Sequence, residues 1–417
     1  MLELYYVRPD TCDHVRASWI GGPIERYVEW LTENGYTSRT VLRRIPLLME
    51  FGEFARLQGV TTLQDLPGQI EGFMQHWLQK HGQGCKTDKA RSCVLDEARN
   101  PVMQMLSLVM PELKEKRRVE PFQELVPGLF NYLRNERGLK ESTLNNYRSS
   151  LYAFEKYLQN IDLKELSDLS PVILSGFVTS SSGLCKDTLG IRCTAVRILL
   201  RYIYRERIIS RDLSGVLESP RSYRLSSIPR SITWEEANRM LGAVDRRIPL
   251  GKRDYTILLM LVTYGLRAKE IASLTLDDID WRQGRLRVSE RKAGHSTAYP
   301  LSTIVGEAIL DYLQHGRPKT SDRRIFLRTK APYIPMTYES VSGRAARYLR
   351  KAGIPVCRPG SHTLRHTCVQ RLVDADFSLK AIGDYVGHRS ADSTAIYAKV
   401  AVDALREIGS GVGEDIL

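Results

Sequence analysis

The feature that most constrains the fold of this chain is an internal repeat. The stretch YVEWLTENGYTSRTVLRRIPLLMEFGEF, which begins at Tyr27, resembles FNYLRNERGLKESTLNNYRSSLYAFEKY later in the chain. Gly35 pairs with Gly138, an offset of 138 − 35 = 103 residues, and the match continues ungapped from TTLQDL against KELSDL. Because similarity at a fixed period identifies a repeated supersecondary unit, we expect two copies of one small domain.

Both copies carry the same helical signals. Gly35 and Gly138 stand where a helix is expected to end, because glycine readily adopts the left-handed conformation of a helix C-terminus. Ser38 and Ser142 stand near the start of a second helix, whose apolar residues recur at helical spacing. Each copy is therefore expected to be helical.

The domain division follows from stretches that interrupt these patterns. PELKEKRRVEP is charged and bracketed by proline, and SGVLESPRSYRLSSIPRS is rich in Ser, Arg and Pro, so both are typical of linkers. We expect an extra N-terminal helical domain that repeats the next one, a second helical domain, a linker and a last domain, over residues 1–115, 116–211, 212–231 and 232–417.

The last domain mixes helices with a small sheet. TWEEANRML places Thr233 three residues before Glu236, which is the spacing of a helix capping box. The stretch LTLDDIDWRQGRLRVSERKAGHSTAYPL predicts three short strands with turns at Gln283-Gly284 and Ala293-Gly294. Helical patterns fill the remainder. The expected fold is thus multidomain and mainly α, with two helical domains before an α+β domain that holds a small antiparallel sheet.

Charge and composition narrow the function. Lys and Arg number 61 against 48 Asp and Glu, a formal net charge of +13, which favours a polyanion such as nucleic acid as the partner. A basic surface kept for solubility is the alternative. No stretch approaches the roughly 20 apolar residues that span a bilayer, and the N-terminus shows no secretion signal. We therefore expect a cytoplasmic protein without a membrane partner.

The seven cysteines form no CxxC pair, which suits reduced thiols in a reducing compartment. His76, His81, Cys85 and Cys93 lie close in sequence, but their spacing matches no familiar zinc site. We expect no metal at these positions.

Five pieces of the last domain carry chemical groups: TYGLRAKEI, the strand hairpin, HTLRH, VGH and STAIYAKV. Their side chains are Arg267 and Glu270, Lys292, His362 with Arg365 and His366, His388, and Tyr397. Arg267 and Glu270 are three residues apart and are expected to share a helix face. Each piece taken alone also has a purely structural explanation. A lone arginine is usually solvated at the surface, a lone tyrosine usually packs in the core, and HTLRH could be a helix start whose histidines are hydrogen-bonded.

Together the pieces match the demands of phosphodiester cleavage without a metal. Two guanidinium forks grip non-bridging oxygens better than ammonium groups do. Histidines add hydrogen bonds or move protons near neutral pH. A lysine can protonate the leaving oxygen, and a tyrosine hydroxyl can serve as the covalent nucleophile. The chain supplies all of these groups and no two-metal carboxylate cluster.

In order and spacing these pieces resemble the signature of the tyrosine recombinase, or phage integrase, family over roughly residues 116–417. The resemblance implies that Arg267, Lys292, His362, Arg365, His388 and Tyr397 are catalytic and that Glu270 and His366 are supporting residues. Two features depart from the family pattern. Gly294-His295 stands where relatives often carry another basic residue, and the copy over 1–115 is not part of the minimal architecture.

The resemblance also implies how such a chain works. It implies a SAM-like core-binding domain and a catalytic domain that clamp duplex DNA, and strand exchange through a 3′-phosphotyrosine. The expected partners are double-stranded recombination sites and further copies that form dimers and tetramers on DNA, with sister recombinases or accessory DNA-bending proteins as further candidates. It implies no cofactor, ATP or metal, and a bacterial cytosolic protein that joins the nucleoid when bound to DNA. The extra copy mildly favours a transposon or integrative element.

Alternative functions stay open at this point. A type IB topoisomerase or telomere resolvase cuts with a similar set of residues, and a DNA-binding regulator could have lost catalysis. An RNA-processing protein has only the charge in its favour, since the chain shows no RNA-recognition motif.

Overall fold

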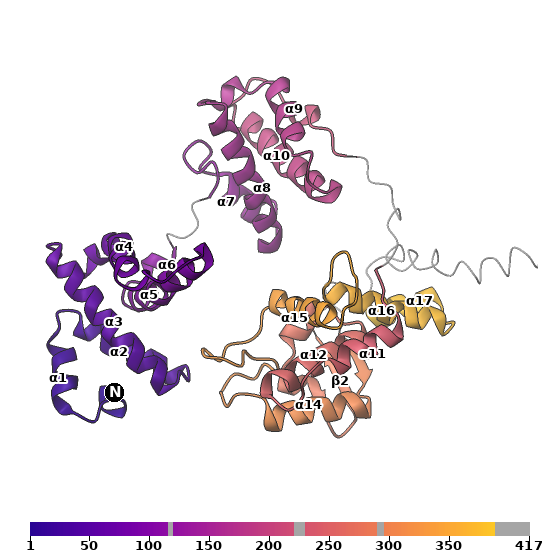
Figure 1. Cartoon of the computed structure of the whole chain (residues 1–417). Coiled ribbons are helices and arrows are strands. Elements are labelled where there is room, and N and C mark those ends of the chain that lie inside the picture. Colours follow the sequence, from indigo (N-terminus) through magenta and orange to yellow (C-terminus); the bar gives the residue numbers. More distant parts are fainter. Residues whose placement is uncertain (116–119, 221–229, 290–295, 388–417) are drawn as a thin grey trace, which may run out of the picture. The chain divides into compact units, whose positions relative to one another are not determined.

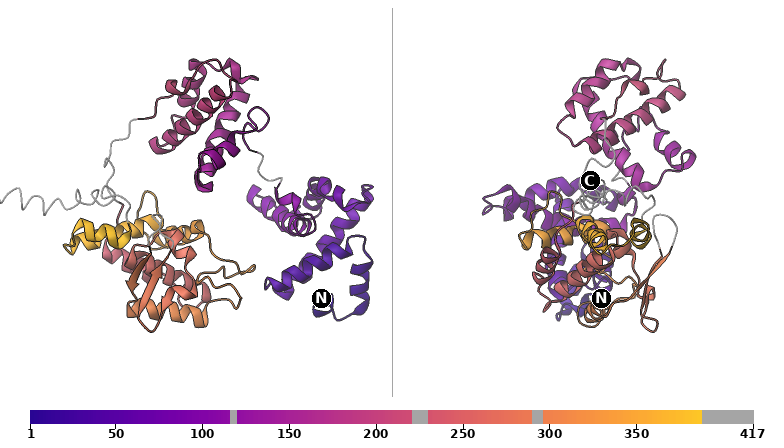
Figure 2. Two further views of the ribbon diagram at one scale, coloured as in Figure 1. Left: turned by 180° about the vertical axis from the view of Figure 1, so that it is seen from behind. Right: turned by 90° about the vertical axis from the view of Figure 1, so that its right-hand side faces the viewer.

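The chain forms helical domains and one mixed domain, which are best described separately (Figures 1 and 2). The residues that the computed structural model describes are 1–115, 120–220, 230–289 and 296–387. Contacts divide the chain into two compact units, one formed by Met110–Ser226 and one formed by Met1–Val109 together with Ser227–Leu417.

The segment Met1–Val109 is helical throughout. Its elements are η1 (Leu2–Leu4), α1 (Pro9–Ala17), α2 (Gly21–Glu33), α3 (Ser38–Leu57), η2 (Leu63–Gln69), α4 (Ile70–His81) and α5 (Asp88–Val109). Helix α5 contacts α2, α3 and α4. The buried residues of these helices form the core of the segment, with Phe51 of α3 and Phe73 of α4 packed edge to face.

The unit Met110–Ser226 is also helical. Its elements are α6 (Glu112–Glu115), α7 (Leu129–Asn131), the π-helical turn η3 (Tyr132–Glu136), α8 (Glu141–Asn160), η4 (Leu166–Asp168), α9 (Pro171–Ser180), α10 (Lys186–Arg205) and η5 (Ser214–Val216). Helices α8 and α10 lie side by side (Figure 2). Leu213 and Leu217 are buried in the same hydrophobic core, so the chain stays packed on this unit for several residues beyond 211.

The two copies of the repeat share their second helix residue for residue. Helix α3 starts at 38 and α8 at 141, and they end at 57 and 160, so both bounds differ by 103. Each copy then packs an aromatic pair edge to face. The ring centroids of Phe51 and Phe73 are 5.2 Å apart at 63°, and those of Phe154 and Phe177 are 4.9 Å apart at 62°. The sequence repeat is therefore a repeat of structure.

The ungapped alignment is wrong by one residue in the first helix of each copy. There the buried residues Ile20, Ile24, Tyr27, Val28 and Leu31 match the buried residues Phe122, Val126, Leu129, Phe130 and Leu133 at an offset of 102. The offset becomes 103 by Gly35 and Gly138, which both have positive φ, +74° and +60°. The second copy contains the π-helical turn η3 between these points, and such a turn accommodates an inserted residue within a helix.

The segment from residue 230 to 387 combines helices with three strands. Its elements are α11 (Trp234–Gly242), α12 (Pro249–Tyr264), α13 (Ala268–Ser273), η6 (Leu276–Asp278), β1 (Ile279–Asp280), β2 (Arg285–Val288), β3 (Thr297–Pro300), α14 (Thr303–His315), α15 (Tyr338–Lys351), α16 (Ser361–Asp374) and α17 (Leu379–Val386). Helix α12 is buried along its length and contacts α14 and α16, so it forms the centre of the core.

The small sheet has the predicted form. Its strands are antiparallel in the order β1-β2-β3, with Leu286 opposite Ile279 on one side and Tyr299 on the other. Gly284 has φ of +60° in the turn between β1 and β2, as a tight turn requires. The predicted turn at Ala293-Gly294 lies outside the described residues.

The predicted capping box at the start of α11 is also confirmed. The Thr233 hydroxyl accepts the backbone N–H of Glu236 at 3.2 Å, and the Glu236 carboxylate accepts the backbone N–H of Thr233 at 3.0 Å. All seven cysteines are free thiols. Within the described ranges, no helix combines the length and the apolar character needed to cross a membrane, and no three His, Cys, Asp or Glu side chains gather in a metal-binding arrangement.

We expect Phe154→Ala to lower the free energy of unfolding by about 3–5 kcal/mol, because the substitution leaves a cavity in a fully buried aromatic pair. The matched control is Tyr152→Ala on the same helix, whose side chain is 39% exposed and whose loss should change stability by less than about 0.5–1 kcal/mol. Chemical denaturation of both variants checks this. Equal effects would contradict the core that we describe.

Candidate active site

Arg267 stands at the junction of two helices. Helix α12 ends at Tyr264, and Gly265 follows with a left-handed φ of +60°. Arg267 is extended and immediately precedes α13, so the expectation that Arg267 and Glu270 share a helix face is wrong. Instead the Glu270 carboxylate accepts both the backbone N–H of Arg267 and its Nη1, each at 2.8 Å. Glu270 is only 3% exposed, so a buried carboxylate fixes the position of the Arg267 guanidinium.

Arg365 lies on α16 and is 5% exposed. Its Nη1 donates to the carbonyl oxygen of Gly265 at 2.5 Å, and its Nη2 donates to that of Val386 at 2.8 Å. The Nη2 of Arg267 donates to the next carbonyl along, that of Gly387, at 2.8 Å. The two guanidinium groups therefore meet at the C-terminal end of α17, where helix carbonyls lack intrahelical donors and carry partial negative charge.

Two glycines make this convergence sterically possible. Gly265 and Gly387 both adopt the left-handed conformation, with φ of +60° and +68°. A Cβ at Gly265 would lie 3.1 Å from Cys368 Sγ and 3.1 Å from Val386 Cγ1. Sequence reasoning did not single out either glycine as part of the site. Their positions beside the arginine in TYGLR and the histidine in VGH are the signal that could have identified them.

The two histidines of HTLRH lie on the first turns of α16, beside Arg365. Their ring centroids are 6.5 Å apart. Burial lowers the pKa of His366 to about 4, helped by the positive charges near it, and the pKa of His362 is lowered by desolvation and then by Arg365 and Arg267. His362 is exposed and His366 is half-buried, and the lowered pKa of each favours the neutral ring at neutral pH.

The structure brings together five of the residues singled out in the sequence, namely Arg267, Glu270, His362, Arg365 and His366. The other three, Lys292, His388 and Tyr397, lie outside the described residues. After the segment that holds Lys292, the described chain resumes at Ser296, one residue before β3. The last described residue, Gly387, directly precedes His388 in sequence.

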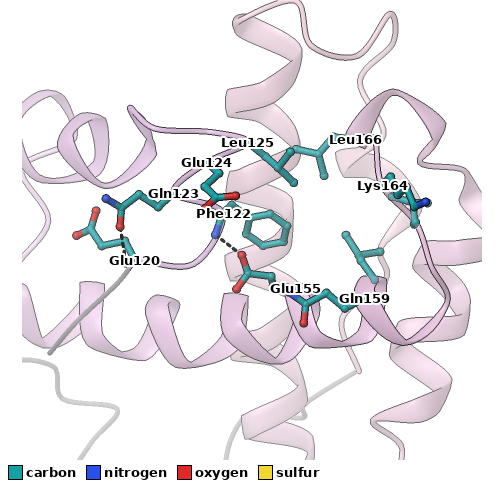
Figure 3. Close-up of a pocket in the computed structure, with 11 residues that line it drawn as sticks. Glu120, Phe122, Gln123, Glu124, Leu125, Glu155, Gln159, Lys164 and Leu166 are labelled. Atoms are coloured by element: carbon teal, nitrogen blue, oxygen red, sulfur yellow. Dashed lines mark hydrogen bonds between the residues drawn. The ribbon is translucent and has the colours of Figure 1, made fainter. Parts of the chain in front are cut away.

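A separate pocket lies in the unit Met110–Ser226 and does not suit a phosphate ligand. It has a cavity volume of about 430 Å³ (Figure 3). Three carboxylates, those of Glu120, Glu124 and Glu155, line it together with one lysine, Lys164. One of these carboxylates accepts the backbone N–H of Phe122 at 2.6 Å. Because carboxylates repel phosphate oxygens, the candidate active site is the arginine-rich one.

Two parts of the chain match known protein families. Residues 230–403 match the family described as "Phage integrase family". Residues 126–207 match the family described as "Phage integrase, N-terminal SAM-like domain". The first match includes the arginine-rich site, and the second covers the helices α7 to α10 in full.

Individual proteins are similar over most of the chain. A Sinorhizobium fredii protein named as an integrase/recombinase, y4rA, is 32% identical over 93% of this chain and 94% of its own length. The tyrosine recombinase XerD of Vibrio vulnificus is 32% identical over 66% of this chain and 90% of its own length. The solved structure of the XerH recombinase in a post-cleavage complex with its difH substrate has a TM-score of 0.53 at 18% identity, covering 82% of this chain and 94% of that one, which shows a shared fold.

The pKa of His366 makes the stability of this region depend on pH. The unfolded chain binds a proton on this histidine near its ordinary pKa of 6.5, whereas the folded chain binds it only near pH 4. Its contribution to stability is therefore complete above pH 6.5 and is lost as the pH falls toward 4. Chemical denaturation measures the free energy of unfolding at each pH. Between pH 6.5 and 4, we expect this free energy to fall by on the order of 1–3 kcal/mol less for His366→Gln than for the parent chain. Parallel curves for the two proteins between pH 6.5 and 4 would refute the assignment.

Proposed function

Since this chain belongs to the phage integrase family of tyrosine recombinases, which cleave and rejoin DNA, we propose that it recombines specific DNA sites through a covalent 3′-phosphotyrosine on Tyr397. The observation that carries this proposal is the pair of guanidinium groups, Arg267 and Arg365, held on adjacent carbonyl oxygens at the end of α17. Two fixed forks of this kind suit the two non-bridging oxygens of a phosphodiester.

The proposed reaction is a transesterification at phosphorus. The phenolic oxygen of Tyr397 gives its proton to solvent water and attacks the phosphorus atom, and the bond from phosphorus to the 5′ oxygen breaks. Lys292 gives the departing 5′ oxygen its proton, so that a 5′-hydroxyl and a 3′-phosphotyrosine result. Attack by the 5′-hydroxyl of the partner strand reverses these steps and joins the strands. The energy of the broken bond is kept in the phosphotyrosine.

The remaining site residues serve this step in the proposal. His362 and His388 donate hydrogen bonds to the phosphate oxygens, where charge develops in the transition state. The lowered pKa of His362 supports a neutral ring that donates through one nitrogen. Glu270 holds Arg267 by two hydrogen bonds, and His366 supports the first turns of α16.

The proposed partners and domain roles follow the family. The catalytic domain, 232–417, and the core-binding domain, 116–211, are joined by a linker over 212–231 and clamp a double-stranded recombination site. Dimers form on one site and tetramers on two, with sister recombinases or DNA-bending proteins as further partners. A net charge of +13 supports binding to duplex DNA. The additional copy over 1–115 has no assigned role in this scheme.

Covalent trapping on DNA tests the nucleophile. A suicide substrate nicked near the cleavage site should accumulate a protein–DNA adduct with the parent chain, because the short 5′-ended strand diffuses away after cleavage. We expect Tyr397→Phe to give no adduct while still binding the site, since phenylalanine lacks the attacking oxygen. The adduct is measured by denaturing gel electrophoresis.

The matched control is Tyr338→Phe, which alters an exposed tyrosine at the start of α15 and should leave adduct formation unchanged. If the parent chain binds the site but forms no adduct, the regulator without catalysis is the correct reading. Relaxation of supercoiled plasmid that lacks any specific site, without joined products, would favour the topoisomerase alternative.

The arginine pair predicts a loss of rate without a loss of binding. We expect Arg365→Lys to slow single-turnover cleavage roughly 10²–10³-fold, because an ammonium group cannot reproduce a planar fork aimed at the phosphate. Arg350→Lys, an exposed arginine on α15, provides the control and should cleave at the parent rate. A cleavage rate for Arg365→Lys within about threefold of the parent would remove Arg365 from the proposed site.

A further inference from the structure

We propose that Tyr299 is a positioning residue for DNA cleavage, because its hydroxyl fixes the end of α17 on which both arginines rest. This inference depends on the proposed function, since it assigns Tyr299 a part in the same cleavage step. Tyr299 lies in β3, in the strand hairpin that also carries Lys292, but it is not among the residues to which the sequence signature gives a role.

Three consecutive carbonyl oxygens at the end of α17 each accept a hydrogen bond from a different element. The carbonyl of Tyr385 accepts from the Tyr299 hydroxyl at 2.5 Å. The carbonyl of Val386 accepts from Nη2 of Arg365, and that of Gly387 from Nη2 of Arg267, each at 2.8 Å. These donors come from β3, from α16 and from the residue before α13. The end of one helix thus serves as a common anchor for the sheet and for both arginines.

The Tyr299 hydroxyl is held in one direction by its surroundings. The residue is 1% exposed, and its ring packs against Tyr264 at 5.2 Å and, edge to face at 84°, against Tyr385 at 5.0 Å between centroids. The Tyr385 hydroxyl in turn donates to the carbonyl of Thr263 in α12 at 3.3 Å. Tyr299 and Tyr385 therefore connect β3, the end of α17 and the end of α12.

This connection matters because α17 is short and ends within a few residues of both arginine contacts. Carbonyls in the last turn of a helix have no intrahelical donors, so side-chain donors decide where that turn sits. If the Tyr299 hydroxyl is lost, the end of α17 can shift, and the anchors of both guanidinium groups shift with it. Misplacement of a catalytic group by about 1 Å can cost roughly 100-fold in rate. The strand that carries Tyr299 also follows the segment that holds Lys292.

The first test removes only the hydroxyl. We expect Tyr299→Phe to slow single-turnover cleavage of the nicked substrate roughly 10- to 100-fold, with the dissociation constant for the intact site unchanged within about twofold. The matched control is Tyr312→Phe in α14, which also removes a buried tyrosine hydroxyl, one that accepts the backbone N–H of Leu327 at 3.3 Å. That hydrogen bond involves neither β3 nor the end of α17, so the folded variant should cleave at the parent rate.

A double-mutant cycle separates positioning from a general loss of structure. If Tyr299 acts through the arginine anchors, its substitution should cost less than about threefold in an Arg267→Lys background, where that anchor is already altered. Equal losses in the two backgrounds, or a parent rate for Tyr299→Phe, would overturn the proposal. If Tyr299→Phe folds poorly, replacement of Tyr299 by 4-aminophenylalanine keeps a ring donor for the Tyr385 carbonyl. A folded variant of this kind that cleaves more than about tenfold below the parent rate would overturn the proposal. A parent chain that binds DNA but forms no adduct would instead overturn the proposed function itself, and the inference with it.

Discussion

The carbonyl oxygens that end helix α17 hold both guanidinium groups of the site, and the rest of the site depends on that arrangement. Neutral carbonyl acceptors fix the direction of a guanidinium without cancelling its charge, whereas a carboxylate does both. Arg267 also pairs with a carboxylate, that of Glu270. Helix α17 is itself pinned to α16 by a small apolar cluster of Val369, Ile382 and Val386. The hydrophobic contact between these two helices thus helps to determine where the two guanidinium groups lie.

The histidines fit this electrostatic setting. Burial and the neighbouring arginines lower the pKa values of His362 and His366, so both rings are favoured in their neutral form at neutral pH. A neutral imidazole donates through one nitrogen and accepts through the other. The site therefore combines permanent cations with neutral, directional donors, a combination that binds an anion without requiring a proton to be added first.

The sequence predicted the helices, strands and chemical groups of this protein better than the contacts between them. Periodicity, the capping residues Thr233 and Glu236 and the glycine turn at Gly284 were sufficient to predict helices and strands, because those signals are local. The chemical groups were identified by type and order. The contacts between these groups were not predicted. Arg267 precedes α13 instead of lying on it, and hydrogen bonds to backbone carbonyls, such as that of the Tyr299 hydroxyl, cannot be inferred from the order of side-chain types. The roles of Lys292, His388 and Tyr397 stay predictions, since these residues lie outside the described part of the chain.

The π-helical turn η3 bears on how the duplicated domains have diverged. One copy has gained or lost a residue inside its first helix, yet the buried positions on both sides of that point still match between the copies. A helix that absorbs a length change by locally widening keeps its apolar stripe directed at the core, whereas an ordinary helix would rotate every later side chain by about 100°. Such a turn lets a domain drift in length without refolding, and it hides the event from any comparison that tolerates no gaps.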